Sequence, residues 1–170
     1  GVHAAVQRAR FFLRCNRWFF KSDVEKFFDS IDHEILLKTL ARTIKDRSLL
    51  DLTEQIIRNG GANGRGLPIG NLTSQFLANV YLDPFDRFIR ETCGQRHYVR
   101  YMDDFVVFNR DKDVLKQLRP AIEAFLSEKL RLDLKPSATY FNGCREGLSF
   151  LGLRIFPALI RLRPENLRRI

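Results

Sequence analysis

The chain has 170 residues, 45% of them hydrophobic and 15 of them Phe, which suits one compact domain with a single core and excludes a disordered chain. Its 29 Lys and Arg outnumber 20 Asp and Glu, and the resulting net charge of +9 fits either plain solubility or a polyanionic partner such as nucleic acid. No apolar run has the length that a bilayer requires, so we expect no membrane partner.

The first half of the chain predicts a helix, a strand and then further helices. An apolar face, with arginines elsewhere, predicts a helix over 3–14, and the aromatic run over 18–24 predicts a strand. Two helical patterns fill 31–59. Glycines and a proline break the pattern over 60–70 and predict a loop, after which helical spacing resumes over 72–89.

The second half of the chain predicts short apolar strands around one long helix. The expected elements are strands at 97–101 and 105–109 joined as a hairpin, a helix at 114–130, and a closing hairpin formed by 149–156 and 159–162. Pro120 is expected to open or kink the long helix, and Pro164 to start another helix.

Without the connecting insertion, these elements follow the order β-α-β-β-α-β, which is the ferredoxin-like split arrangement. The sequence therefore predicts an α+β fold in which helices cover one face of an antiparallel sheet and the other face is left free for a ligand. In this arrangement the first strand and the central hairpin are neighbours, so the end of that strand lies beside the hairpin turn.

Three carboxylates occupy surroundings that disfavour charge. Asp23 ends the aromatic strand, and Asp103 and Asp104 lie in a hairpin with apolar arms, so we expect them to converge although 80 positions separate Asp23 from Asp103. Like charges in a half-buried site raise one another's pKa unless a cation is present, and Mg²⁺ suits oxygen ligands. Two such ions can activate a primer hydroxyl and stabilise departing pyrophosphate. Taken singly, Asp103-Asp104 also fits an ordinary polar turn, and Asp23 a capping or strand-end residue.

Five short motifs follow one another along the chain. They are DVEKFFDSIDH at 23–33, LPIGNLTSQFLAN at 67–79, YMDD at 101–104, LKP at 134–136 and FLG at 150–152. In order and spacing they resemble the palm motifs of reverse transcriptases, with YMDD matching the YxDD signature. The resemblance implies a reverse transcriptase palm with part of the fingers over 1–170, with upstream fingers and downstream thumb missing and 157–170 starting the palm–thumb connection.

The resemblance also implies an activity and a metal site. The activity is that of an RNA-directed DNA polymerase, whose partners are an RNA template, a DNA primer and dNTPs. Asp23 and Asp103 would bind two Mg²⁺ ions, with Asp104 assisting and the Val24 carbonyl as a further ligand.

Further contacts with substrate are implied for eight positions. The nucleotide-binding residues would be Phe28 as the steric gate against a ribose 2′-hydroxyl, Ile69, Gly70, Gln75 and Lys135, and the primer grip would be Phe150, Leu151 and Gly152. Some of these positions also fit a plainer role: Phe28 can be a core ring, Lys135 a solvated lysine and the FLG run a core strand. Likewise, Arg8, Arg10 and Arg14 fit either the end of the missing fingers or a solvated helix face.

The run IGNLTSQ at 69–75 resembles that of reverse transcriptases of diversity-generating retroelements, which copy a template RNA with errors at adenines. This implies a bacterial or phage-encoded enzyme with a basic accessory protein. The three cysteines form no CxxC pair and no secretory signal is present, which indicates a cytoplasmic location. Two alternatives stay open: a catalytically idle reverse-transcriptase-like module for RNA binding or defence, and a ferredoxin-like RNA-binding domain without chemistry.

Overall fold

A computed structural model describes residues 1–61, 63–68, 70 and 72–162. The helices are α1 Val2–Cys15, α2 Phe27–Ser30, α3 His33–Thr43, α4 Arg47–Arg58, α5 Leu72–Tyr81, α6 Asp83–Arg87, the π-helix η1 Phe88–Thr92, α7 Lys112–Leu130, and the 3₁₀ turns η2 Pro136–Ala138 and η3 Cys144–Glu146. The strands are β1 Trp18–Ser22, β2 Tyr98–Tyr101, β3 Asp104–Asn109, β4 Tyr140–Gly143, β5 Leu148–Phe150, β6 Leu153–Ile155 and β7 Ile160–Leu162. Within the described ranges, none of the helices combines the length and apolar character needed to span a membrane.

The central sheet has four strands in the order β2-β3-β1-β4, and each neighbouring pair is antiparallel. This order, with helices between β1 and β2 and between β3 and β4, is the split β-α-β-β-α-β arrangement, so the predicted α+β fold is confirmed. The expected fourth strand was misplaced, however. It is β4 (Tyr140–Gly143), which pairs with β1, whereas 149–156 holds two strands of a separate sheet in the order β5-β6-β7.

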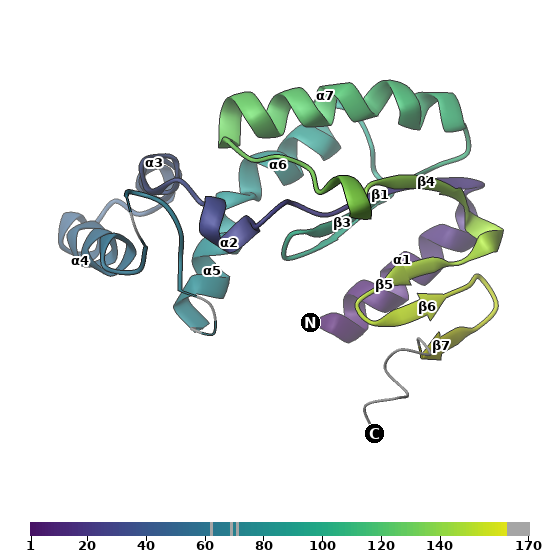
Figure 1. Ribbon diagram of the computed structural model, residues 1–170, viewed down its shortest axis with the longest axis horizontal. Coiled ribbons are helices and arrows are strands. Elements are labelled where there is room, and N and C mark those ends of the chain that lie inside the picture. Colours follow the sequence, from purple (N-terminus) through teal and green to yellow (C-terminus); the bar gives the residue numbers. More distant parts are fainter. Residues whose placement is uncertain (62, 69, 71, 163–170) are drawn as a thin grey trace.

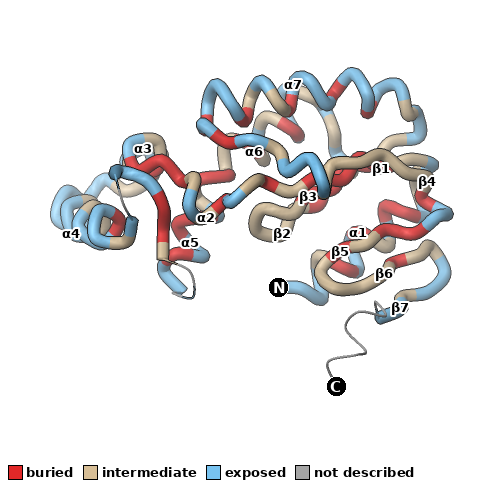
Figure 2. Tube along the Cα trace, in the orientation of Figure 1, coloured by how far each residue is buried: buried red, intermediate tan, exposed pale blue. Residues whose placement is uncertain are grey.

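The two faces of the central sheet belong to different cores, because successive side chains of a strand point to opposite faces. Phe20, Phe105 and Val107 lie in a core with residues of α3 and α5 to α7. Phe19 and Val106 lie in a second core with residues of α1, β5 and β6. Figure 1 shows α6 and α7 on one side of the sheet and α1 with the second sheet on the other, and Figure 2 shows buried segments on both sides. The face expected to be free is therefore partly covered.

Prolines account for two differences from the expected helices. The helix expected over 72–89 is interrupted after Tyr81 and restarts as α6, because Pro84 lacks an N–H and fits only the first turn of a new helix. Conversely, α7 runs without interruption through Pro120 instead of being opened by it. Pro120 and Lys116 are exposed, so water can solvate the Lys116 carbonyl that loses its helical donor. The helix expected from Pro164 lies outside the described residues.

The closing hairpin around Pro157 and Ala158 is confirmed as β6–β7, and α1 is fastened to it. Arg14 Nε donates to the Pro157 carbonyl at 2.8 Å, and Arg10 Nη2 donates to the Ala158 carbonyl at 2.6 Å. Two of the three α1 arginines thus hold the second sheet against the helix, rather than being simply solvated.

Candidate active site

The β2–β3 hairpin presents Asp103 at its tip. Tyr101 pairs with Asp104, so the turn consists of Met102 and Asp103. Met102 has a φ of 55°, in the left-handed region that a non-glycine residue rarely adopts. Two-residue hairpin turns require such a conformation to match the twist of their strands, and residues held in it cluster at functional sites. The backbone therefore fixes where Asp103 lies.

Asp23 is held next to that turn by pairing on both sides. Ser22, the last residue of β1, pairs with Phe105, which places Asp23 beside Asp104. The Asp23 carbonyl accepts a hydrogen bond from the Lys135 N–H at 2.8 Å, and one carboxylate oxygen of Asp23 accepts from the Val24 N–H at 3.0 Å. The expectation that the first strand and the hairpin bring these carboxylates together is confirmed.

The closeness of the carboxylates is visible in their electrostatics. Burial, the charge and hydrogen bonding of Asp23, and the charge of Asp104 raise the pKa of Asp103 from 3.8 to about 6. Below about pH 6 such a pair retains a proton, and above it the two adjacent carboxylates oppose each other's ionisation and favour a nearby cation. The arrangement is thus suited to binding a hard cation.

Asp104 has a partner that the sequence did not reveal. Lys21 Nζ lies 2.6 Å from an Asp104 carboxylate oxygen, and the exposed fraction of the Lys21 side chain is 10%. Lys21 pairs with Val106, two residues from Asp104, so both side chains lie on one face of the sheet as diagonal neighbours. A lysine inside the aromatic run of β1 was the available signal, since a buried lysine needs an acidic partner.

The donor set for a prospective metal can be tested against the described residues. Among the described residues, no group of three or more His, Cys, Asp or Glu side chains is placed to hold a metal ion. Mg²⁺ is usually bound by one or two carboxylates, with water and substrate phosphates completing its shell, so Asp23 and Asp103 fit this ion. The metal-binding role predicted for Asp104 stays a prediction.

The Val24 carbonyl is directed away from the neighbouring chain segment. Val24 forms a bridge with Leu134, and its hydrogen bonds join the flanking residues: Glu25 N–H to the Asp133 carbonyl, and Lys135 N–H to the Asp23 carbonyl. In such a non-hydrogen-bonded pair, the central N–H and C=O point outward. The geometry is compatible with the expected ligand role of Val24.

The predicted nucleotide-binding residues come from several different segments of the chain. Lys135 is exposed, and its backbone is hydrogen-bonded to Asp23. Phe28 is half-buried in α2, and its carbonyl accepts from Leu67 N–H at 2.9 Å, which joins it to the segment before Gly70. Gly70 is exposed with a φ of 100°, and Gln75 is exposed on α5. Ile69 lies outside the described residues.

The predicted primer grip is a tight turn joining β5 to β6. Leu151 and Gly152 have φ values of 51° and 78°, as a two-residue hairpin turn requires. Phe150 is 1% exposed and packs in the core shared with α1, so its side chain supports the turn from inside. The primer-grip role is still a prediction, and the residues exposed enough to contact a primer are Leu151 and Gly152.

Comparisons with known proteins match most of this chain. The family model described as "Reverse transcriptase (RNA-dependent DNA polymerase)" matches residues 7–155. The group II intron-encoded protein LtrA of Lactococcus lactis subsp. cremoris is 30% identical over 224 residues, covering 91% of this chain and 37% of that protein. Protein YkfC of Escherichia coli (strain K12) is 25% identical over 199 residues, covering 91% of this chain and 52% of that protein.

The fold is also similar to that of solved structures. Apo telomerase from Candida tropicalis, truncated from the C-terminal domain, superposes with a TM-score of 0.74 at 15% identity, covering 96% of this chain and 40% of that one. At this identity the likeness concerns the fold. The chain spans about half or less of the length of each of these proteins.

Proposed function

Because this chain belongs to the reverse transcriptase family, we propose that it is the core of an RNA-directed DNA polymerase that adds dNTPs to a primer 3′ end on an RNA template. The observation that carries the proposal is the contact between Asp23 and Asp103, whose charges oppose each other in a half-buried site. We call this site, formed by Asp23, Asp103 and Asp104, the carboxylate corner. Such a pair is costly to keep ionised without a cation, and a polymerase uses a cation at this point.

Each residue of the corner has a task in this proposal. Asp23 and Asp103 hold two Mg²⁺ ions, and the Val24 carbonyl is a further ligand. When bound, these ions lower the pKa of the primer 3′-hydroxyl and offset the charge on the leaving pyrophosphate. Asp103 must be ionised to act as a ligand, and Lys21 forms an ion pair with Asp104 beside it.

A second group of residues is proposed to select and contact the nucleotide. Phe28 follows Asp23 by five positions and is proposed to exclude a ribose 2′-hydroxyl. The exposed Gly70 backbone approaches the incoming base, Gln75 contacts nucleotide or template, and Lys135 donates a proton to pyrophosphate. The net charge of +9 favours binding of the template and primer.

Low fidelity belongs to the proposal as well. The IGNLTSQ run places Ile69 where a glutamine amide is usual in group II intron and retroviral enzymes, so a hydrogen-bonding group near the nucleotide is lost. We therefore propose errors at template adenines, a cytoplasmic bacterial or phage setting and a basic accessory protein. Equal misincorporation opposite all four template bases would contradict the fidelity part alone.

Primer extension on an RNA template, with Mg²⁺ and dNTPs, tests the proposal. The complete protein is compared with Asp103→Asn, which removes the charge at nearly constant volume, and with Asp51→Asn, the same change at an exposed position of α4. We expect extension by the wild type and Asp51→Asn, and none by Asp103→Asn. Extension by Asp103→Asn at the wild-type rate would refute the proposed site.

A further inference from the structure

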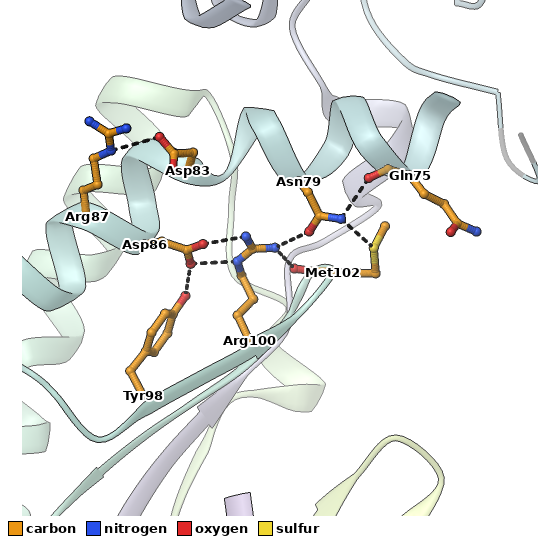
Figure 3. Close-up of polar contacts among 8 residues, drawn as sticks. All are labelled: Gln75, Asn79, Asp83, Asp86, Arg87, Tyr98, Arg100 and Met102. Atoms are coloured by element: carbon orange, nitrogen blue, oxygen red, sulfur yellow. Dashed lines mark hydrogen bonds and ion pairs between the residues drawn. The ribbon is translucent and has the colours of Figure 1, made fainter. Parts of the chain in front are cut away.

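Arg100, on β2, connects three separate parts of the molecule through one guanidinium group. Its Nε and Nη2 donate to the two carboxylate oxygens of Asp86 on α6, at 2.8 and 2.6 Å. Its Nη1 donates to the Met102 carbonyl at 2.8 Å and to Asn79 Oδ1 on α5 at 3.0 Å. Figure 3 shows these bonds converging beside the hairpin turn. The side chain is only 9% exposed, so water competes little for its donors.

The Asp86 end of this arrangement is fixed from a second direction. Tyr98 Oη donates to the Asp86 carboxylate at 2.8 Å, so this carboxylate accepts from two residues of β2. Burial, and then the charge of Asp86, raises the pKa of Tyr98 well above its ordinary value, so Tyr98 stays a donor at any working pH. A bidentate, partly buried arginine–carboxylate pair leaves the guanidinium little freedom to turn.

Asn79 connects Arg100 to the helix α5, which follows the predicted nucleotide-binding residue Gly70. Asn79 Nδ2 donates to the Gln75 carbonyl at 3.0 Å and lies 3.6 Å from Met102 Sδ. Asn79 therefore contacts both the backbone of α5 and the side chain of the strained turn residue. The helix α5 begins at Leu72, two positions after Gly70, which is a predicted nucleotide-binding residue. These contacts therefore join the turn that carries Asp103 to the helix that follows Gly70.

We infer that Arg100, Asp86 and Asn79 form a positioning clamp that holds the Met102–Asp103 turn in its left-handed conformation and so sets the Asp103 carboxylate against Asp23. The inference rests on the proposed function and adds positioning residues to it. None of the three touches the reacting atoms. Arg100 acts on Asp103 through the Met102 carbonyl, which belongs to the peptide bond between Met102 and Asp103. A carbonyl held by a charged donor cannot rotate away without losing that hydrogen bond.

An ion pair on the same helix provides a matched control. Arg87 Nε lies 3.0 Å from an Asp83 carboxylate oxygen, with side chains 67% and 49% exposed. In Figure 3 this pair lies on α6 away from the clamp and makes no drawn contact with the hairpin. Arg87→Met therefore removes an arginine–aspartate pair of similar chemistry without touching the turn.

The test measures metal binding and catalysis separately in the complete protein, using wild type, Arg100→Met, Arg100→Lys, Asn79→Ala and Arg87→Met. Mn²⁺ serves as the probe, and its binding without substrate is followed by electron paramagnetic resonance. We expect the Mn²⁺ dissociation constant to rise about 10- to 100-fold in Arg100→Met, as for residues that orient metal ligands, with a smaller rise in Arg100→Lys and Asn79→Ala and no change in Arg87→Met. In steady-state extension, kcat should fall with little change in KM for dNTP.

Asn79→Ala keeps the exposed helix position and the Arg100–Asp86 pair, so it remains informative if Arg100→Met does not fold. Unchanged Mn²⁺ affinity and kcat in folded Asn79→Ala and Arg100→Lys would show that the clamp is only structural. Failure of wild-type protein to bind Mn²⁺ would instead refute the metal site itself, so the two failures are distinguishable.

Discussion

The carboxylate corner and the substrate side, by which we mean Gly70 and the start of α5, differ in how firmly the protein's own contacts hold their side chains. At the corner, Asp23, Asp104 and the Met102–Asp103 turn are all held by hydrogen bonds or an ion pair of 3.0 Å or less. On the substrate side, α5 opens with Leu72 and Phe76, which are 83% and 62% exposed. Two large apolar side chains this exposed on one helix fit the substrate-contacting surface that the proposed function requires.

The difference fits the division of labour in the proposed reaction. Charged groups that hold a cation need geometry fixed in advance, because reorganising them during the reaction is costly. A surface that accepts successive base pairs has to accommodate different partners, and the nucleic acid completes it. The corner should therefore respond to single substitutions with large effects, and the substrate side with smaller changes in selectivity.

The largest expected effect comes from removing a carboxylate at the corner. Asp23→Ala should lower the rate of extension by at least about a thousandfold, since a cation at this point supplies several kcal/mol of transition-state stabilisation. Asp51→Ala, at an exposed position of α4, is the control and should retain the wild-type rate. Single-turnover extension with saturating template and primer measures both. A folded Asp23→Ala variant with more than a tenth of the wild-type rate would contradict the contrast between the two regions.

Breaking the Lys21–Asp104 pair should be the largest change in stability. Lys21→Met keeps the aliphatic length but leaves the Asp104 charge without its 2.6 Å partner, and we expect a loss of about 3 kcal/mol in the free energy of unfolding. Added Mn²⁺ should raise the melting temperature more in this variant than in wild type, because removing the Lys21 ammonium leaves more negative charge for the cation to offset.

Lys116→Met is the matched control for that substitution. It breaks an ion pair of 2.8 Å with Asp113 in which both side chains are mostly exposed, so it should cost less than about 1 kcal/mol. Denaturant unfolding with chelator present measures both variants. Equal losses in the two would mean that Lys21 has no special place in the corner.

The raised pKa of Asp103 predicts how stability depends on pH when no metal is bound. Between the ordinary value of 3.8 and about 6, the folded state holds a proton that the unfolded state has released. The shift corresponds to about 3 kcal/mol, which solvent screening of the partly exposed carboxylate reduces to about 2 kcal/mol. Stability should therefore fall by this smaller amount as the pH rises through the window, and Asp103→Asn should remove that part of the fall. Unfolding at a series of pH values with chelator tests this. Asp113→Asn, at an exposed site, should keep the fall, and identical profiles for wild type and Asp103→Asn would contradict the prediction.

The sequence was sufficient for the parts of the fold that depend on local pattern. The two short apolar runs over 97–101 and 105–109 predicted the hairpin, and its turn predicted the place of Asp103. The strand β4 was missed because Tyr140–Gly143 is short and ends in Asn-Gly, a typical turn pair, so that only pairing with β1 makes it a strand.

The candidate site divides in the same way. The closeness of Asp23 and Asp103 was predicted from the sequence, because it depends only on where the first strand ends and where the hairpin turns. The contacts of Lys21 and Arg100 could not be found, since they depend on the register of β1 against β3 and on the break that separates α5 from α6. A side chain's partner across a sheet follows from three-dimensional pairing, which spacing along the chain does not determine.

The smallest expected effect concerns Phe28, on the substrate side. Its ring packs edge-on against Phe27 with a centroid separation of 5.5 Å, and the residue is half-buried. Phe28→Ala should lower the preference for dNTP over rNTP about tenfold or more, as expected when a side chain that excludes one hydroxyl is removed. Phe28→Tyr keeps the ring and should keep the preference. Competition between dNTP and rNTP during extension measures the ratio directly. A ring that serves only the core would instead lower stability on truncation and leave the ratio unchanged. Measuring stability and selectivity on the same variant therefore decides whether Phe28 serves only the core or also belongs to the surface that the nucleotide completes.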